Sequence, residues 1–435
     1  MKRAFKFRFY PDDDQTAELS RTFGCVRKVY NLALAARTEA WARREHVGYG
    51  QTSAMLTQWK RTEEFTYLAE VSCVPLQQAL RHLNSAFTAF REGRARHPRF
   101  KSKRRSRAAA EYTRSAFRFH AGQLTLAKMA APLAVAWSRP VPKDKEPTTV
   151  TVSRDPAGRW FVSLLFAATP VPLPITTQAV GIDVGLKALV TLSTGEKVPN
   201  PKHGRRGRER LARAERTLSR KQKGSANRAK ARIRVARMRA RIADRRRDHL
   251  HKLTTRLVRD NQTLVIEDIT VRNLLKNRRL ARAIGDASWR ELRTMLEYKA
   301  AWYGRTLIVV DRWFPSSKLC SACGALADAM PLNIRTWTCT GCGTTHDRDV
   351  NAAVNLLAAG LAAAACGARV RPHRDPSRPG RRAVKQEAPT REGAPPPLRE
   401  GGKAKQPNLG VSNAALPSAM PADTLRTSSQ QQSIN

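Results

Sequence analysis

The sequence predicts an α/β fold for the second half of the chain, with a helical segment and a small β domain before it. After residue 179, stretches with strand periodicity alternate with stretches of helix periodicity, which is typical of a sheet covered by helices. Residues 11–90 carry apolar side chains at helical spacing, whereas residues 115–175 hold short β-like stretches broken by prolines. These three observations define the expected architecture.

The first ten residues predict a strand, because Phe5, Phe7 and Phe9 alternate with polar or basic residues up to Pro11. Asp12, followed three residues later by Gln15, is typical of the start of a helix. Further strands are expected at 117–119, 133–137, 148–152 and 160–166. We expect these strands to form a small sheet or barrel that the N-terminal strand joins.

In the second half, residues 179–195 predict two strands around a glycine turn. Residues 202–248 contain 20 Lys or Arg and only 4 acids, and their helix-spaced apolar residues predict long helices with one buried stripe and basic outer faces. The remaining elements are expected as a strand at 263–267, a helix at 289–302, a strand at 306–311 and a final helix from about 351 to 365.

The chain is strongly basic, with 80 Lys and Arg against 35 Asp and Glu among 435 residues, a formal net charge of +45. Nucleic acid is the partner that best neutralises such a surplus, because phosphate contacts release counterions. The longest apolar run, residues 356–366, is shorter than the roughly 20 residues that a membrane-spanning helix needs. We therefore expect a soluble, cytoplasmic protein that does not act on membranes.

Four of the seven cysteines predict a structural zinc site. They form two Cys-x-x-Cys pairs 15 residues apart, each pair is followed by glycine, and the four are Cys320, Cys323, Cys339 and Cys342. A site with four thiolates leaves no open coordination position, which indicates a structural metal. The scattered Cys25, Cys73 and Cys366 are interpreted as buried thiols.

Three acids are candidate ligands for a second metal centre. Asp183 lies within the apolar run 180–184 and Glu267 ends the apolar run 264–267, and a carboxylate in a buried strand is costly unless it has a partner. Asp347 and Asp349 open the last helix, where acids often only stabilise the helix dipole. An α/β fold could bring two strand acids and one helix acid together, and such a set suits Mg²⁺ or Mn²⁺.

The densest basic stretches, 91–107 and 202–247, have too few acids to read as ordinary solvated faces, and we interpret them as surfaces for a phosphate backbone. The candidate contacts are Arg99, Lys101, Lys103, Arg104, Arg105, Arg232 and Arg239. Trp289, Trp302 and Trp313 could stack on bases, but burial is the favoured interpretation for each.

The chain resembles the transposon-associated TnpB (OrfB-type) family over roughly residues 1–366. The shared motifs, in family order, are Phe7-Arg-Phe-Tyr-Pro11, Phe23-Gly-Cys-Val-Arg27, Pro98-Arg-Phe-Lys-Ser-Lys103, Gly181-Ile-Asp-Val-Gly185, Ile266-Glu-Asp268, Leu296-Glu-Tyr-Lys-Ala300, Ser316-Ser-Lys318, the cysteine pairs and His346-Asp-Arg-Asp-Val-Asn-Ala-Ala353. The resemblance implies an RNase H-like (RuvC) nuclease domain with an inserted zinc ribbon, related to the type V CRISPR nucleases.

By position, the resemblance implies that Asp183, Glu267 and Asp349 are the three catalytic, Mg²⁺-binding acids, with Asp347 as the alternative third acid. It implies the following regions: a wedge-like β domain at 1–10 and 115–175, a helical recognition lobe at 11–114, the nuclease domain at 176–315 and 346–366, and the zinc ribbon at 316–345. The proline-rich residues 367–435 fall outside the resemblance and are expected to be disordered.

The expected function is that of an RNA-guided, Mg²⁺-dependent DNA endonuclease encoded by a transposable element, with a guide RNA and target DNA as partners. Two alternatives remain. One is a transposase that transfers DNA strands directly, and the other is a regulator that binds nucleic acid without cutting it.

Overall fold

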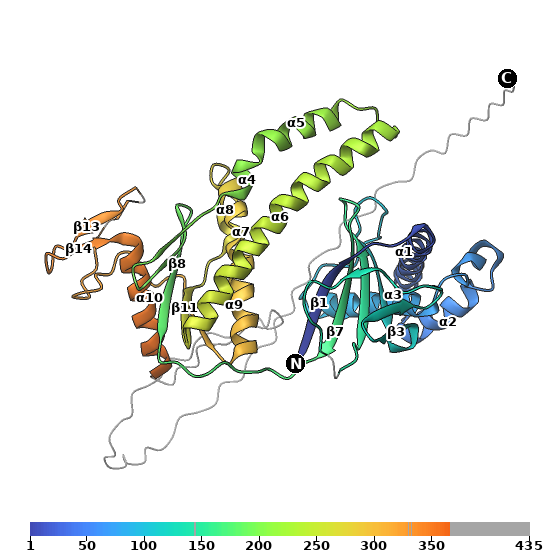
Figure 1. The fold of residues 1–435 in the computed structure, drawn as a ribbon, viewed down its shortest axis with the longest axis horizontal. Helices are drawn as coiled ribbons and strands as arrows, with labels where there is room; N and C mark the ends of the chain where they lie inside the picture. Colours follow the sequence, from blue (N-terminus) through green and yellow to red (C-terminus); the bar gives the residue numbers. More distant parts are fainter. Residues whose placement is uncertain (143–144, 329, 332, 366–435) are drawn as a thin grey trace, which may run out of the picture. The chain divides into compact units, whose positions relative to one another are not determined.

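The computed structural model describes residues 1–142, 145–328, 330–331 and 333–365 (Figure 1). All of them belong to one compact unit, Met1–Arg378. The tail expected to be disordered lies outside the described residues. Within the described part, we find no helix that combines the length and the apolar character needed to cross a lipid bilayer.

The N-terminal strand β1 lies between β7 and β5 in an antiparallel sheet with the strand order β2-β6-β7-β1-β5. Its strands are β1 (Lys2–Phe9), β2 (Ala108–Thr113), β5 (Val135–Ala136), β6 (Thr149–Arg154) and β7 (Trp160–Ala167), with a separate hairpin of β3 (Phe117–His120) and β4 (Gln123–Leu126). The expectation that the N-terminal strand joins this region is confirmed. The described pairings leave β2 and β5 as edges, so the expected barrel is an open sheet.

The predicted helical segment forms three long helices, α1 (Asp13–Ala42), α2 (Tyr49–Trp59) and α3 (Cys73–Arg91), with short 3₁₀ turns at Glu63–Leu68 and Arg114–Ala116. Asp12 caps α1 as predicted, because its Oδ1 accepts a hydrogen bond of 2.7 Å from the backbone N–H of Gln15. Cys25 is buried in this helical core, as expected. Cys73 is exposed, which corrects the expected burial, and Cys366 lies outside the described residues.

The second sheet has the order β10-β9-β8-β11-β12, in which β8, β11 and β12 run parallel and β9 and β10 run antiparallel to their neighbours. The strands are β8 (Ala179–Val184), β9 (Ala188–Leu192), β10 (Lys197–Pro199), β11 (Thr263–Glu267) and β12 (Thr306–Val310). The associated helices are α6 (Ala226–Asp260), α7 (Val271–Leu274), α8 (Ala281–Ala287), α9 (Trp289–Tyr303) and α10 (Arg348–Ala365). This alternation confirms the predicted α/β class.

Helices cover both faces of this sheet. On one face, Val180, Ile182, Leu264 and Ile266 share a core with apolar residues of α6 and α9. On the other face, Val265 and Ile308 pack against Leu356 of α10. Because side chains alternate along a strand, the residues between those of the first set point toward α10. The acids of interest lie on this second face.

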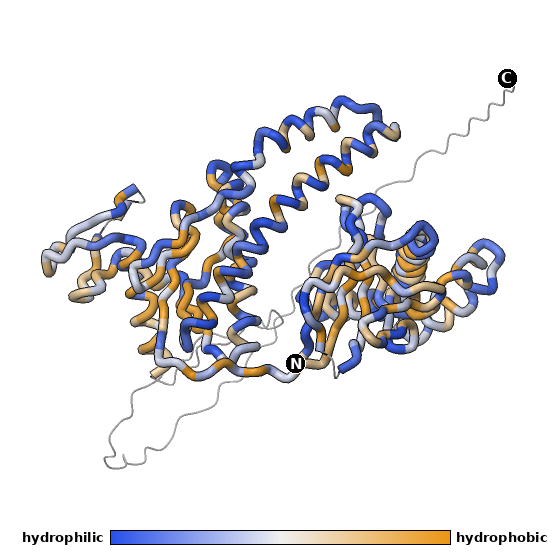
Figure 2. The backbone as a smooth tube through the Cα atoms, in the orientation of Figure 1, coloured by the Kyte–Doolittle hydropathy of each residue, from blue (hydrophilic) through white to orange (hydrophobic). Residues whose placement is uncertain are grey.

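The basic segment forms α4 (His203–Arg206), α5 (Arg208–Ser219) and the long α6, as the sequence predicts. Figure 2 shows these helices as mainly hydrophilic, with isolated hydrophobic positions along α6. In the N-terminal half of α6, Val235 is the buried residue. From Leu250 to the end of the helix, the apolar residues belong to the core that includes the sheet. The basic half of α6 is therefore available for contacts with other molecules.

Helix α10 approaches the sheet so closely that two glycines are required. A Cβ atom at Gly181 would lie 2.0 Å from the carbonyl oxygen of Ala353, and one at Gly360 would lie 2.6 Å from a methyl group of Val265. Since real Cβ atoms cannot approach so closely, any larger side chain at these positions has to displace α10. The glycines thus set the distance between β8 and the helix that carries Asp349.

We expect Gly181→Ala to lower the free energy of unfolding by about 1–3 kcal/mol, because the added methyl group overpacks a backbone contact. Chemical denaturation measures the change. Gly285→Ala is the matched control, since a Cβ atom there meets nothing within 4 Å and the substitution raises helix propensity in α8. Equal stability of wild type and Gly181→Ala would contradict the close contact.

Candidate metal centres

The four predicted cysteines converge. All four Sγ atoms lie within 4.8 Å of one another, with 3.7 Å between those of Cys320 and Cys342 and 3.6 Å between those of Cys323 and Cys339. A tetrahedral site with Zn–S bonds of about 2.3 Å requires sulfur atoms about 3.8 Å apart. The donors and their spacing therefore fit a structural Zn²⁺ ion.

The turns and neighbours of this cluster also fit a zinc site. Gly324 and Gly343 have φ angles of +76° and +72°, a left-handed conformation that glycine adopts without strain after each cysteine pair. His346 places its Nε2 3.0 Å from the Sγ of Cys320, where the ring can donate a hydrogen bond to a thiolate. His346 belongs to β14 (Thr345–Asp347), which pairs with β13 (Thr336–Thr338) and leads into α10.

The cysteine segment is attached to α10 by two buried asparagines. The Nδ2 of Asn351 donates to the carbonyl of Leu319 (2.7 Å), and its Oδ1 accepts from the N–H of Ser321 (2.9 Å). The Nδ2 of Asn355 donates to the carbonyls of Ser316 (2.8 Å) and Leu319 (2.7 Å). Because these partners flank Cys320, the position of the ribbon is tied to the first turns of α10.

We expect the purified protein to hold one zinc ion per chain and Cys323→Ser to lose it, since three thiolates bind zinc less tightly than four. Elemental analysis by mass spectrometry measures the zinc content, and thermal denaturation should show a lower melting temperature for the variant. Cys73→Ser removes an exposed cysteine outside the cluster and should keep the metal. Full zinc content in Cys323→Ser would rule out the site.

Asp183 and Glu267 lie side by side at the ends of two parallel strands. The register of β8 and β11 pairs Ile182 with Ile266, so the next residue on each strand is an acid. Neighbouring strands are about 4.8 Å apart. Asp183 shares its face with Gly181, which contacts α10, and Glu267 shares its face with Val265, which also contacts α10. Both carboxylates therefore lie on the side of the sheet that α10 covers.

Asp349 belongs to the first turn of α10, which begins three residues earlier than the sequence predicted. It precedes Ala353 by four residues, about one helical turn, and thus lies on the same side of the helix as the contact with Gly181. Asp347 has a different environment. Its Oδ1 accepts hydrogen bonds of 3.1 Å from the N–H groups of Asp349 and Val350, and its Oδ2 pairs with Lys197 at 2.5 Å.

The electrostatic surroundings of Asp183 include the other two candidate acids. Burial raises the pKa of Asp183 to about 8, and the negative charges of Asp349 and Glu267 contribute in the same direction. Arg348 and Arg335 oppose this rise, and the Nη1 of Arg335 donates to the Oδ1 of Asp349 at 2.9 Å. Lys197 and the helix N–H groups lower the pKa of Asp347, although partial burial opposes them.

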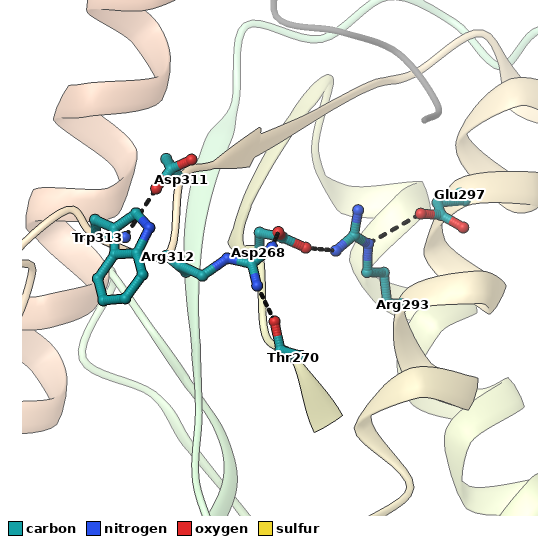
Figure 3. Close-up of polar contacts among 7 residues, drawn as sticks. All are labelled: Asp268, Thr270, Arg293, Glu297, Asp311, Arg312 and Trp313. Carbon is teal, nitrogen blue, oxygen red and sulfur yellow. Dashed lines mark hydrogen bonds and ion pairs between the residues drawn. The ribbon is translucent and has the colours of Figure 1, made fainter. Parts of the chain in front are cut away.

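The carboxylate beside Glu267 is neutralised by arginines. Figure 3 shows Asp268 between Arg312, which follows β12, and Arg293 of α9, which also reaches Glu297. Burial opposes ionisation of Asp268, but the hydrogen bonds and charges of the two arginines lower its pKa. Glu267 has no such partner, and burial together with the charge of Asp268 raises its pKa.

The acids are spaced more widely than the cysteines. Within the described residues, the cysteine cluster is the one group of three or more metal-ligating side chains whose ligand atoms all lie within 4.8 Å of one another. The ligand atoms of the three acids are thus not all as close together as those of the cysteines. The donor set of the acids, carboxylate oxygens alone, is the kind that Mg²⁺ and Mn²⁺ prefer.

Asp183→Asn should stabilise the protein in buffer without added Mg²⁺ or Mn²⁺. The folded pKa of about 8 lies above the ordinary value of 3.8, so between about pH 4 and pH 8 the folded state binds more protons and stability falls as pH rises. The gain from Asn should therefore grow over that range to a few kcal/mol, on the order of 1.4 kcal/mol per unit of pKa shift before solvent screening. Denaturation at several pH values measures it.

Asp347→Asn is the matched control for this prediction. The folded pKa of Asp347 is lowered, so its carboxylate stabilises the fold above its ordinary pKa and the variant should lose stability at neutral pH. A stability gain for Asp183→Asn that does not change with pH would contradict the raised pKa of Asp183.

The predicted nucleic-acid contacts do not form one uniform group. Arg99, Lys103, Arg104, Arg105, Arg232 and Arg239 are exposed, although Arg239 pairs with Glu215 at 2.5 Å. Lys101 is partly buried and lies 3.6 Å from the ring centroid of Tyr30, while Asn31 holds its backbone on both sides. Burial lowers the pKa of Lys101. Its contacts indicate a structural role more than a free phosphate contact.

Sequence reasoning missed several residues around the acids. Arg335 lies in the ribbon outside any spacing motif, and its contact with Asp349 appears only when the ribbon docks on α10. Arg293 and Arg312 gave no sequence signal as partners of Asp268. Among the tryptophans, Trp289 is buried as expected, but Trp313 is 85% exposed, so its predicted burial is wrong.

Three family models match the chain. They are described as a probable transposase (OrfB_IS605, residues 150–278), a Cas12f1-like TNB domain (residues 289–356) and a helix-turn-helix domain (HTH_OrfB_IS605, residues 1–46). The helix-turn-helix match spans β1 and α1 of this structure, and the TNB match includes the four cysteines and Asp349.

Two relatives cover most of the chain. A Streptomyces pristinaespiralis protein is 67% identical over 388 residues, 89% of this chain and 96% of that protein. An Escherichia coli protein, InsQ, is 34% identical over 401 residues, 85% of this chain and 96% of that protein. Both carry the name "Putative RNA-guided DNA endonuclease". Three mimivirus proteins named TnpB-like match 28% of the chain.

Among solved structures, the cryo-EM structure of a Cas12f1–sgRNA–target DNA complex has a chain that aligns with a TM-score of 0.53 at 13% identity. The alignment covers 82% of this chain and 98% of that one. At 13% identity, this comparison shows a similar fold.

Proposed function

Because the chain belongs to the TnpB (OrfB-type) family of transposon-associated proteins, we propose that it is an RNA-guided DNA endonuclease with a RuvC-like centre formed by Asp183, Glu267 and Asp349. The observation that carries the proposal is that Asp183 and Glu267 end two paired parallel strands on the face that α10 packs against, and that Asp349 lies in the first turn of α10. The names of the relatives support the same activity.

The three acids would hold Mg²⁺ or Mn²⁺ ions, which when bound activate a water molecule and stabilise the leaving 3′ oxygen of a phosphodiester. The chain itself supplies the arrangement of the ligands. Gly181 permits the close approach of α10, and Asp347 caps the helix so that the next turn begins with Asp349 in place. The Nη1 of Arg335 donates to the Oδ1 of Asp349 and orients that carboxylate, and it brings a positive charge near the site where a phosphate would lie.

The guide RNA and the target DNA would be bound through the basic surfaces, which include the exposed arginines of α6. Phosphate contacts of this kind give affinity without sequence preference, as expected when base pairing with the guide supplies the specificity. The zinc ribbon, tied to α10 by Asn351 and Asn355, supports the helix that carries Asp349.

A transposase that transfers strands directly is the second candidate, and the description of the matching family model favours it. Covalent joining of donor ends to a target would distinguish it from hydrolysis. A regulator that binds without cutting is a weaker candidate, because all three acids are present and the charges of Glu267 and Asp349 act on Asp183.

The test compares two neighbouring acids. The protein is expressed with its flanking element DNA, the RNA that copurifies is sequenced, and cleavage of a matching duplex is measured with Mg²⁺. We expect Asp349→Asn to lower the cleavage rate at least about a hundredfold, because one metal ligand is lost. Asp347→Asn loses the ion pair with Lys197 but can still accept the hydrogen bonds from the helix N–H groups, so it should fold and still allow cleavage.

Two results would refute the proposal. One is a preparation that carries no RNA and cuts no duplex under any guide supplied. The other is cleavage by Asp349→Asn at the wild-type rate while Asp347→Asn is inactive, which would assign the third ligand to the helix cap.

A further inference from the structure

Trp313 is a large aromatic side chain that the fold leaves in solvent. It follows β12 by three residues, and 85% of its surface is exposed. Figure 3 shows its ring directed away from the Asp268–Arg293 ion pair. Trp313 follows the end of β12 that pairs with Glu267, one of the candidate acids. An exposed tryptophan forfeits the large gain from burying its surface, so its position at a candidate active centre needs an explanation.

The turn that presents Trp313 is held firmly on both sides. The N–H of Trp313 donates to the Oδ1 of Asp311 at 2.9 Å, and the N–H of Phe314 donates to the carbonyl of Asp311 at 3.1 Å. Before it, the Arg312 guanidinium contacts Asp268 and Thr270. After it, Phe314 packs with the apolar cluster against α10. These contacts on both sides fix the backbone of the turn that carries the indole.

The position of this turn relative to the acids follows from the register. Glu267 pairs with Val310, the last residue of β12. Trp313 is three residues beyond Val310, and three residues span at most about 10 Å. The distance from Glu267 to the backbone of Trp313 is therefore comparable to the length of a few nucleotides. A strand whose phosphate lies at the acids would pass within reach of the indole.

We infer that Trp313 is a stacking platform for one base of the substrate strand, next to the phosphodiester that the acids would act on. This inference deepens the proposed function and rests on it. The charge of Arg312 is already neutralised by Asp268, so the turn offers an aromatic face more than a phosphate contact. Stacking on an indole needs a base that has left its own helix, and it accepts any base. The ligand is thus a nucleobase of a single-stranded segment.

A scan with abasic sites tests the inference in the guided protein–RNA complex. A single abasic nucleotide is moved stepwise through the target strand around the cut, and cleavage rates are compared for wild type and Trp313→Ala. We expect Trp313→Ala to cut intact DNA about 5- to 100-fold more slowly. At one abasic position, the cleavage rate of the wild type should fall by a similar factor relative to intact DNA. At that same position, Trp313→Ala should cut as fast as it cuts intact DNA. Trp313→Phe should restore most of the rate.

Trp41→Ala is the matched control, because Trp41 is also exposed (79%) but lies on α1. It should keep the position-dependent loss of the wild type. Equal rates for wild type and Trp313→Ala on intact DNA would overturn the inference, as would the same additional loss in both proteins at every abasic position.

A second measurement does not depend on cleavage. A target oligonucleotide that carries the fluorescent base 2-aminopurine at the sensitive position, or at each position near the acids in turn, is bound to the complex without Mg²⁺. We expect quenching in wild type that Trp313→Ala loses, and unchanged fluorescence in both would overturn the inference. If the quenching holds but no DNA is cut, the endonuclease proposal fails while the stacking site stands.

Discussion

The carboxylate of Asp183 is held in a largely apolar strand, where the negative charges of two further acids act on it. Burial and like charge both disfavour the ionised form, which is why its pKa rises to about 8. Arg335 and Arg348 relieve only part of the charge. Such a cluster is unfavourable for the folded chain alone, and the cations that we propose for this site would offset its cost. The neighbouring Asp268, fully engaged by two arginines, shows the structural alternative.

Much of the fold could be predicted from periodicity, because the strands and helices that form the core have strongly patterned sequences. The strand Thr263–Glu267 has the predicted bounds, and α9 extends one residue past its prediction. The strand β2, Ala108–Thr113, was not predicted, since alanines carry little strand signal and its pairing with β6 depends on residues about 40 positions away. The pairing with β6 therefore determines the strand conformation of this segment.

Some parts of the candidate sites could likewise be predicted from sequence, and others depended on tertiary contacts. The cysteine spacing was sufficient to predict the cluster, because a tetrahedral thiolate site constrains sequence spacing directly. The choice between Asp347 and Asp349 could not be made from sequence, since both precede a helix. In the structure Asp347 accepts hydrogen bonds from the helix N–H groups, whereas the charge of Asp349 acts on Asp183, and for this reason we propose Asp349 as the third acid. Trp313 was misjudged because exposure depends on the turn geometry, and a tryptophan in an apolar neighbourhood usually packs inside.

The asparagine contacts between α10 and the ribbon restrict how this protein could be shortened. Joining the end of β12 directly to α10 would delete the carbonyls of Ser316 and Leu319 that satisfy Asn351 and Asn355, leaving two amides buried without acceptors. The same excision would remove the arginine that contacts Asp349. A compact derivative without zinc would therefore need apolar replacements at both asparagines and a new source of positive charge beside the third acid.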